Sequence, residues 1–149
     1  MWYADWLLSL PLLFLTTLIH AYGLLLVRET ATGIGRHNGE GRGTHPSFVL
    51  VIGGSMLFIT WLHAMEAGMW ALIYLFVGAM PNMREAMLYS MGAMTTFGHA
   101  DIHLADGWQM LGVIESLNGV VLFGLTTATL LSIMESIPVR TGLRHRSRS

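Results

Sequence analysis

The sequence predicts an all-α membrane protein with three transmembrane helices. Hydrophobic residues make up 53% of its 149 residues and charged residues only 11%, whereas soluble domains carry about a quarter charged residues. The hydrophobic residues gather in three long stretches, 6–27, 47–77 and 108–137. Each stretch is long enough to cross a hydrocarbon core of about 30 Å.

The N-terminal segment, residues 1–27, is predicted to be a retained transmembrane helix. Trp2, Tyr3 and Trp6 form an aromatic belt at its start. It lacks the basic residues of a signal peptide, and its apolar run is longer than a signal peptide needs. His20 is interpreted as a neutral histidine in a helix contact.

Residues 28–46 contain five glycines and mixed charge, so they are predicted to form a flexible cytoplasmic linker. The tail, residues 138–149, is basic, because four of the eight arginines lie in the last ten residues. Beside a membrane span, such a tail is expected to contact anionic lipid rather than nucleic acid. A metal site at His37 and His45 is a weaker alternative for the linker.

The arginines also predict the orientation. With the tail in the cytoplasm, three spans place the linker there too, and only Arg84 lies outside. This distribution follows the positive-inside rule. The N-terminus is therefore expected outside and the C-terminus in the cytoplasm.

A short helix is predicted between the second and third spans, at Met83–Met94. Asn82 and Glu85 match a capping box at its start. Twelve residues cannot span a membrane, so the helix indicates a re-entrant segment, which is tolerated where protein or water surrounds it.

The segment after this helix reads Thr-Thr-Phe-Gly-His-Ala-Asp, residues 95–101. It resembles the pore loop of the potassium-channel superfamily, Thr-Val-Gly-Tyr-Gly-Asp. The run 86–98 before it is similar to the family's pore helix, and the run 119–127 to its inner helix. The matched filter positions are, in order, Thr96, Phe97, Gly98, His99, Ala100 and Asp101.

The resemblance implies a bacterial two-helix pore-loop channel with one extra N-terminal span, placed in the inner membrane. Residues 47–137 would then be the pore domain, with outer helix, pore helix, filter and inner helix. Such filters replace an ion's water shell with backbone carbonyls from several subunits. The expected function is a homotetrameric channel for potassium or mixed monovalent cations, with no catalysis and no cofactor besides the permeant ions.

Two filter positions depart from the family pattern. Ala100 replaces a glycine in a conformation that costs a residue with a Cβ about 1–2 kcal/mol. His99 replaces a tyrosine, and because histidine titrates near neutral pH, acid-sensitive conduction is expected. A non-conducting regulatory subunit is the alternative function.

Polar residues inside the spans form a second group of candidates. His63, Glu66 and Glu115 are expected to hydrogen-bond behind the pore helix and support the filter. The alternative is a metal-binding membrane protein that uses these three side chains. Asp101 is expected to concentrate cations at the outer mouth. Gly119 and Gly124 are candidate gating hinges, although close helix packing explains them equally well.

Overall fold

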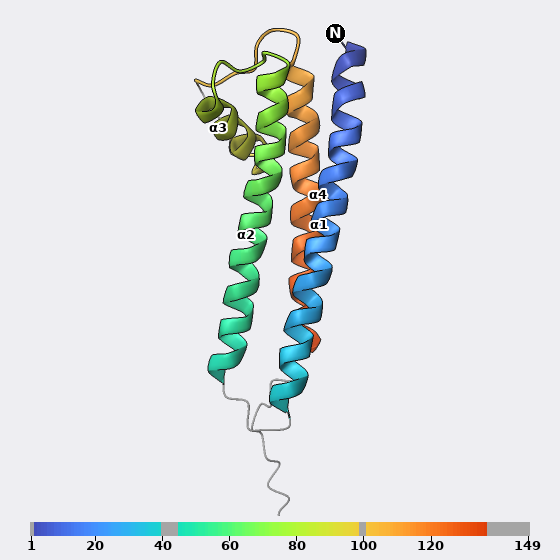
Figure 1. Ribbon diagram of the computed structural model, residues 1–149, viewed down its shortest axis with the longest axis vertical. Coiled ribbons are helices and arrows are strands. Elements are labelled where there is room, and N and C mark those ends of the chain that lie inside the picture. The colour runs from blue at the N-terminus through green and yellow to red at the C-terminus, as the bar shows by residue number, and fades with distance from the viewer. Residues whose placement is uncertain (1, 40–44, 99–100, 137–149) are drawn as a thin grey trace, which may run out of the picture.

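The described part of the chain folds into three long helices and one short helix. The structure, a computed structural model, describes residues 2–39, 45–98 and 101–136. The long helices α1, α2 and α4 run side by side along the length of the molecule (Figure 1). The bounds are Trp2–Gly39 for α1, His45–Phe76 for α2, Met83–Met94 for α3 and Gln109–Ser136 for α4.

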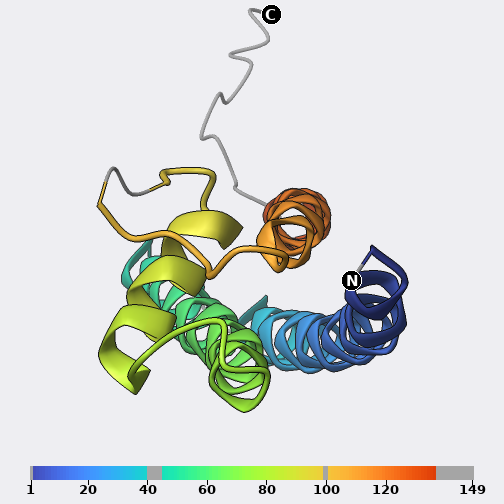
Figure 2. The ribbon, with the colours of Figure 1, turned by 90° about the horizontal axis from the view of Figure 1, so that it is seen from above.

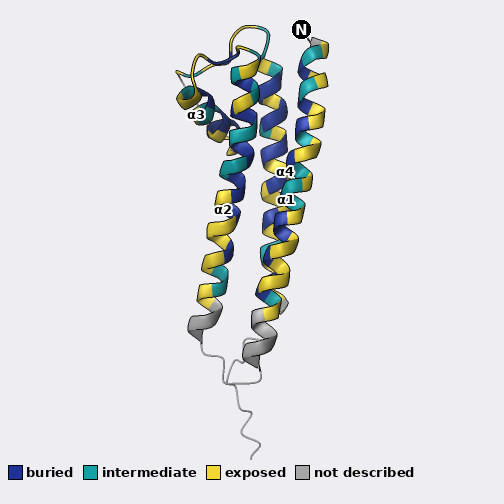
Figure 3. Cartoon of the chain, in the orientation of Figure 1, coloured by how far each residue is buried: buried dark blue, intermediate teal, exposed yellow. Residues whose placement is uncertain are grey.

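The three long helices confirm the three predicted spans. Their apolar parts have a mean hydropathy between 1.5 and 2.0 and are long enough to cross a membrane. Many large apolar side chains, including Leu7, Leu57 and Val120, are exposed on the outside of the chain (Figure 3). An apolar exterior of this kind is what lipid or neighbouring copies of the chain would cover.

The predicted linker at 28–46 is wrong in its first part, because α1 continues through Gly39. Thr30 and Thr32 each donate a hydrogen bond of 2.8 Å to the carbonyl four residues earlier. Ala31 is buried in an apolar cluster that also includes side chains of α2 and α4. Packing against these two helices extends α1 beyond the bilayer length, and spaced glycines do not break a helix as a proline would.

The short helix α3 has the predicted bounds and the predicted cap. Asn82 has an extended backbone, and its side-chain oxygen accepts from the backbone N–H of Glu85 at 3.0 Å. The side chain of Glu85 accepts from the Asn82 amide group at 2.9 Å. Asn82 thus fixes where α3 starts, as the capping box predicts.

The segment that contains α3 starts and ends at the same end of the bundle. The backbone N–H of Ala105 donates to the carbonyl of Ala79 at 3.0 Å, which joins the two ends of this segment. Between them, the Ser90 hydroxyl lies 2.7 Å from the Ala67 carbonyl of α2. Viewed from above, α3 lies on the side of α2 away from α1 (Figure 2).

Gly119 of α4 shows how far α3 extends into the bundle. A Cβ added at Gly119 would overlap the backbone oxygen of Met94, the last residue of α3, and would lie 2.7 Å from its Cα. Gly119 lies about ten residues into α4, which corresponds to about 15 Å along the helix axis. The loop between α2 and α4 therefore reaches about 15 Å below the ends of the helices it joins.

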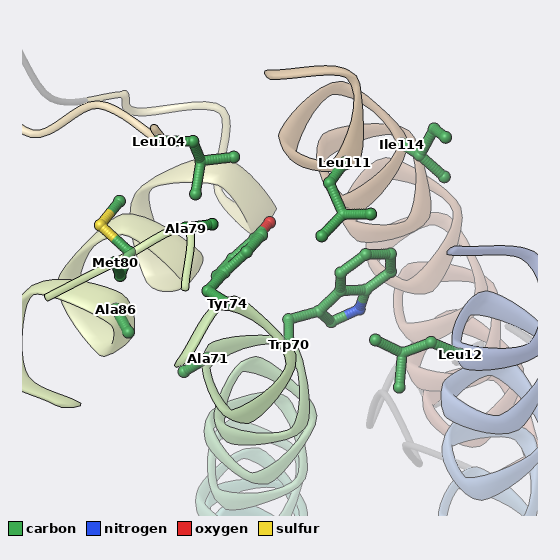
Figure 4. Packing of buried hydrophobic residues seen from close by; sticks show 10 residues of the cluster. All are labelled: Leu12, Trp70, Ala71, Tyr74, Ala79, Met80, Ala86, Leu104, Leu111 and Ile114. Carbon is green, nitrogen blue, oxygen red and sulfur yellow. The ribbon is translucent and has the colours of Figure 1, made fainter. Parts of the chain in front are cut away.

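An apolar cluster at this end of the molecule holds α3 against the long helices. Trp70 and Tyr74 of α2 are fully buried. Trp70 lies near Leu12 of α1 and Leu111 of α4, and Tyr74 lies on the side of Ala79 (Figure 4). Ala79, Met80, Ala86 and Leu104 close the cluster on the α3 side. Within a membrane, side chains packed in this way stabilise the helix contacts mainly through van der Waals attraction.

Candidate functional site

The filter-like segment begins where α3 ends. The N–H of Thr96 donates to Ala93 at 3.0 Å and the N–H of Gly98 to Gly92 at 3.1 Å, so the chain turns sharply. Thr96 has a φ of 57° and Gly98 a φ of 67°. Both values lie in the left-handed region, which a glycine enters without cost and a threonine enters with strain.

The described filter residues are exposed on the single chain. Phe97 is 83% exposed, and Thr95, Thr96 and Gly98 are also exposed. A Cβ at Gly98 would meet nothing within 4 Å, so its φ and not the available space favours glycine there. The predicted filter residues His99 and Ala100 lie outside the described residues. Asp101, the predicted outer-mouth residue, is described and exposed.

Glu115 forms the first of two buried polar clusters, together with Tyr74 and Ser90; we call it the glutamate cluster. The Tyr74 hydroxyl donates to one oxygen of Glu115, and the Ser90 hydroxyl contacts the other. All three side chains are fully buried. Because they come from α2, α3 and α4, the cluster holds the short helix between its two neighbours.

Ser90 also connects Glu115 to α2. Its hydroxyl contacts both the Glu115 carboxyl group and the Ala67 carbonyl. A buried carboxyl group costs less free energy when neighbouring hydroxyl groups hydrogen-bond it.

Glu66 forms the second buried polar cluster, with His20, His63 and Thr126; we call it the histidine cluster. His20 Nδ1 lies 3.0 Å and 3.2 Å from the two oxygens of Glu66. His63 Nδ1 lies 3.5 Å from the nearer oxygen. On the other side of both rings, Thr126 Oγ1 lies 2.9 Å from His20 Nε2 and 3.4 Å from His63 Nε2.

The structure does not bring together the three side chains that the sequence groups. Glu115 belongs to the glutamate cluster, whereas His63 and Glu66 contact His20 instead. Counted from the predicted span ends, Glu66 lies about 6 Å deeper than Glu115. The expected support of the short helix is present, but only Glu115 provides it.

His20 is the functional candidate that the sequence argument missed. It lies 14 residues inside the predicted start of its span, and His63 lies 14 residues inside the predicted end of the next. Because successive spans run in opposite directions, equal counts place the two histidines at equal depth. This equal depth is the feature of the sequence that could have identified His20 as a partner of His63.

The two hinge candidates differ in the structure. Gly119 is explained by the close approach of Met94. Gly124 meets nothing within 4 Å on the single chain, and α4 is a continuous helix across both positions. Nearby, Asn118 donates to the Thr16 hydroxyl at 2.8 Å and links α4 to α1.

No protein-family model, curated protein or solved structure matches the chain. The potassium-channel resemblance therefore depends on the residues of the motif and their place in the fold alone.

Proposed function

We propose that four copies of the chain form a cation channel, which conducts potassium or mixed monovalent cations. The ions would pass along the backbone of Thr96, Phe97, Gly98, His99 and Ala100. The observation that carries this proposal is the course of the loop between α2 and α4. It leaves and rejoins the long helices at one end of the bundle and reaches about 15 Å into it.

The exposure of the filter segment supports a water-filled path beside it. Thr96 and Gly98 are exposed on the single chain. In the proposed arrangement they would lie at a depth where a membrane offers no water from the lipid side. Irregular backbone at such depth is tolerated where it lines a water-filled cavity or is buried in protein. A central path shared by neighbouring copies provides this environment.

The number of copies follows from the chemistry of the filter. Each chain supplies one loop, whereas a filter replaces the ion's water shell with carbonyls from several loops around one axis. A homotetramer is the arrangement that the resemblance implies. The exposed apolar faces of α2 and α4 would pack against neighbouring copies and lipid.

The proposed orientation places α3 and the filter at the external face of a bacterial inner membrane. Arg84 lies on α3, and Arg28 lies far along α1 from that end. Of the remaining six arginines, one lies near the end of α1, one in the sequence between α1 and α2, and four in the tail, which is proposed to meet anionic lipid.

Potassium flux from liposomes tests the proposal. The purified wild-type chain should release trapped potassium, and Gly98→Ala should reduce the rate at least about tenfold, because its left-handed φ costs about 1–2 kcal/mol in each of four copies. Gly124→Ala is the matched control, since its Cβ meets nothing and its backbone is helical.

Two results would contradict the proposal, one against conduction and one against the ion path. Wild-type tetramers without flux would favour the non-conducting regulatory subunit that Ala100 suggests. Equal flux through Gly98→Ala and wild type would show that ions do not pass along this segment.

A further inference from the structure

The histidine cluster has a geometry that the proposed channel does not require. Glu66 and His20 are fully buried and His63 is only 8% exposed. Their nitrogen and carboxylate atoms converge within 4.8 Å of one another, in the middle of the helix bundle. We propose that His20, His63 and Glu66 bind one divalent transition-metal ion of the zinc class.

The distances fit such an ion. Zinc binds imidazole nitrogen at about 2.0–2.1 Å and carboxylate oxygen at about 2.0–2.2 Å, so ligand atoms of a tetrahedral site lie about 3.3 Å apart. Glu66 lies 3.0–3.2 Å from His20 Nδ1 and 3.5 Å from His63 Nδ1. The distances from the Glu66 oxygens to the two histidine nitrogens thus match the distance between ligand atoms in a tetrahedral zinc site.

Thr126 sets the histidine nitrogens for metal binding. Its hydroxyl oxygen lies beside the Nε2 atoms of both His20 and His63. When an ion is bound, this oxygen, which has two lone pairs, accepts an N–H from each ring. Both Nδ1 atoms then point their lone pairs at the ion, on the side of the rings that faces the Glu66 carboxylate. Metal-bound histidines in proteins are generally held in this way through their second nitrogen.

His63 provides an independent observation that points to a ligand. Its Nδ1 atom is buried and makes no hydrogen bond within the described part of the chain, although Glu66 lies at ion-pair distance. A buried polar atom without a hydrogen bond costs about 1–3 kcal/mol. A metal ion at the centre of the cluster would remove this cost.

The donor set selects the class of metal. Two imidazoles and one carboxylate suit zinc, cobalt and ferrous iron better than magnesium or calcium, which prefer oxygen. Three protein ligands leave a fourth position for water or a small anion. Phe123 stacks on His63 with ring centroids 4.4 Å apart and gives the site an apolar wall. A bound ion would fasten α1 to α2.

Metal content of the full-length protein tests the site. The chain is purified in detergent with a histidine-free tag, incubated with zinc and separated from free ions, and the metal is measured by mass spectrometry. We expect one zinc per chain in wild type and less than about a fifth of that in Glu66→Gln, because an amide is a poor zinc ligand. Glu115→Gln and His103→Gln, which change a buried carboxyl group and an exposed histidine outside the site, should keep the full amount.

Cobalt absorbance provides a second measurement that needs no variant. Cobalt added to the wild-type protein should give the intense visible bands of a four-coordinate site, and zinc should abolish them. Wild type without bound zinc and without these bands would overturn the proposal and leave a cluster that holds protons only. Equal zinc in wild type and Glu66→Gln would overturn it too. Neither measurement depends on conduction, so the channel proposal stands or fails separately.

Discussion

The two buried carboxyl groups lie in one helix bundle but in different surroundings. Glu115 contacts two hydroxyl groups, one on each carboxyl oxygen. Glu66 contacts two imidazole rings, one of which has a buried nitrogen without a hydrogen bond in the described part of the chain. Both oxygens of Glu115 thus have a hydroxyl partner, whereas the cluster of Glu66 is the one that we propose a cation completes.

The helices that each cluster joins explain this difference. The glutamate cluster ties α3 to α2 and α4, so it supports the proposed filter loop. The histidine cluster ties α1 to α2 and α4, deeper in the bundle. A buried carboxyl group in a membrane bundle therefore supports structure or suggests a binding site according to its partners, which the sequence alone does not list.

The largest loss of stability is expected from a substitution at Gly119, which allows α3 to pack closely against α4 beside the glutamate cluster. Gly119→Ala would force the Met94 backbone away from α4 and lower the free energy of unfolding by about 3 kcal/mol, because overpacking against backbone is poorly relieved. Thermal unfolding in detergent measures the change, with Gly124→Ala as control. Metal binding should survive, because the histidine cluster does not include α3. Loss of metal binding together with the helix contact would show that the two clusters are not independent.

The next largest loss of stability is expected when the buried glutamate of the histidine cluster, rather than that of the glutamate cluster, is changed to glutamine. Glu66→Gln should lower the free energy of unfolding by about 2 kcal/mol, because it leaves two buried histidines without their carboxylate. Glu115→Gln should change it by less than about 1 kcal/mol, because an amide can accept from Tyr74 and donate to Ser90, which still donates to the Ala67 carbonyl. Equal losses of stability in the two variants would contradict a difference between the two clusters.

The smallest effect is expected at Ser90. Ser90→Ala removes the hydroxyl that joins Glu115 to the Ala67 carbonyl and should cost about 1 kcal/mol. Ser116→Ala is the control, because within the described residues the Ser116 hydroxyl bonds only a carbonyl four residues earlier in its own helix. A loss no larger than that of the control would mean that Ser90 does not hold α3 in place.

The sequence predicted the fold where a local signal was strong. Asn82 predicted the start of α3, and three apolar stretches predicted the long helices. The end of α1 was missed, because its extension to Gly39 depends on packing against other helices and not on glycine content.

The candidate site was predicted only in part. Glu115 supports the short helix as expected, but its partners Tyr74 and Ser90 gave no signal in the sequence. The sequence alone predicts a structural role for His20, because its partners His63 and Glu66 are 43 and 46 positions away in the chain. Contacts between helices depend on rotation and depth, and a single sequence specifies these only weakly.

Current through a planar bilayer tests most directly whether the loop after α3 lines an ion path. The chain has no cysteine, so a single introduced cysteine is the only reactive thiol. We predict that a positively charged, membrane-impermeant thiol reagent on the N-terminal side reduces the potassium current of Asp101→Cys, because it adds positive charge at the proposed outer mouth. Thr60→Cys, exposed within the α2 span, should be unaffected. A wild-type chain that carries no current, or an Asp101→Cys current that the reagent leaves unchanged, would contradict the proposed pore.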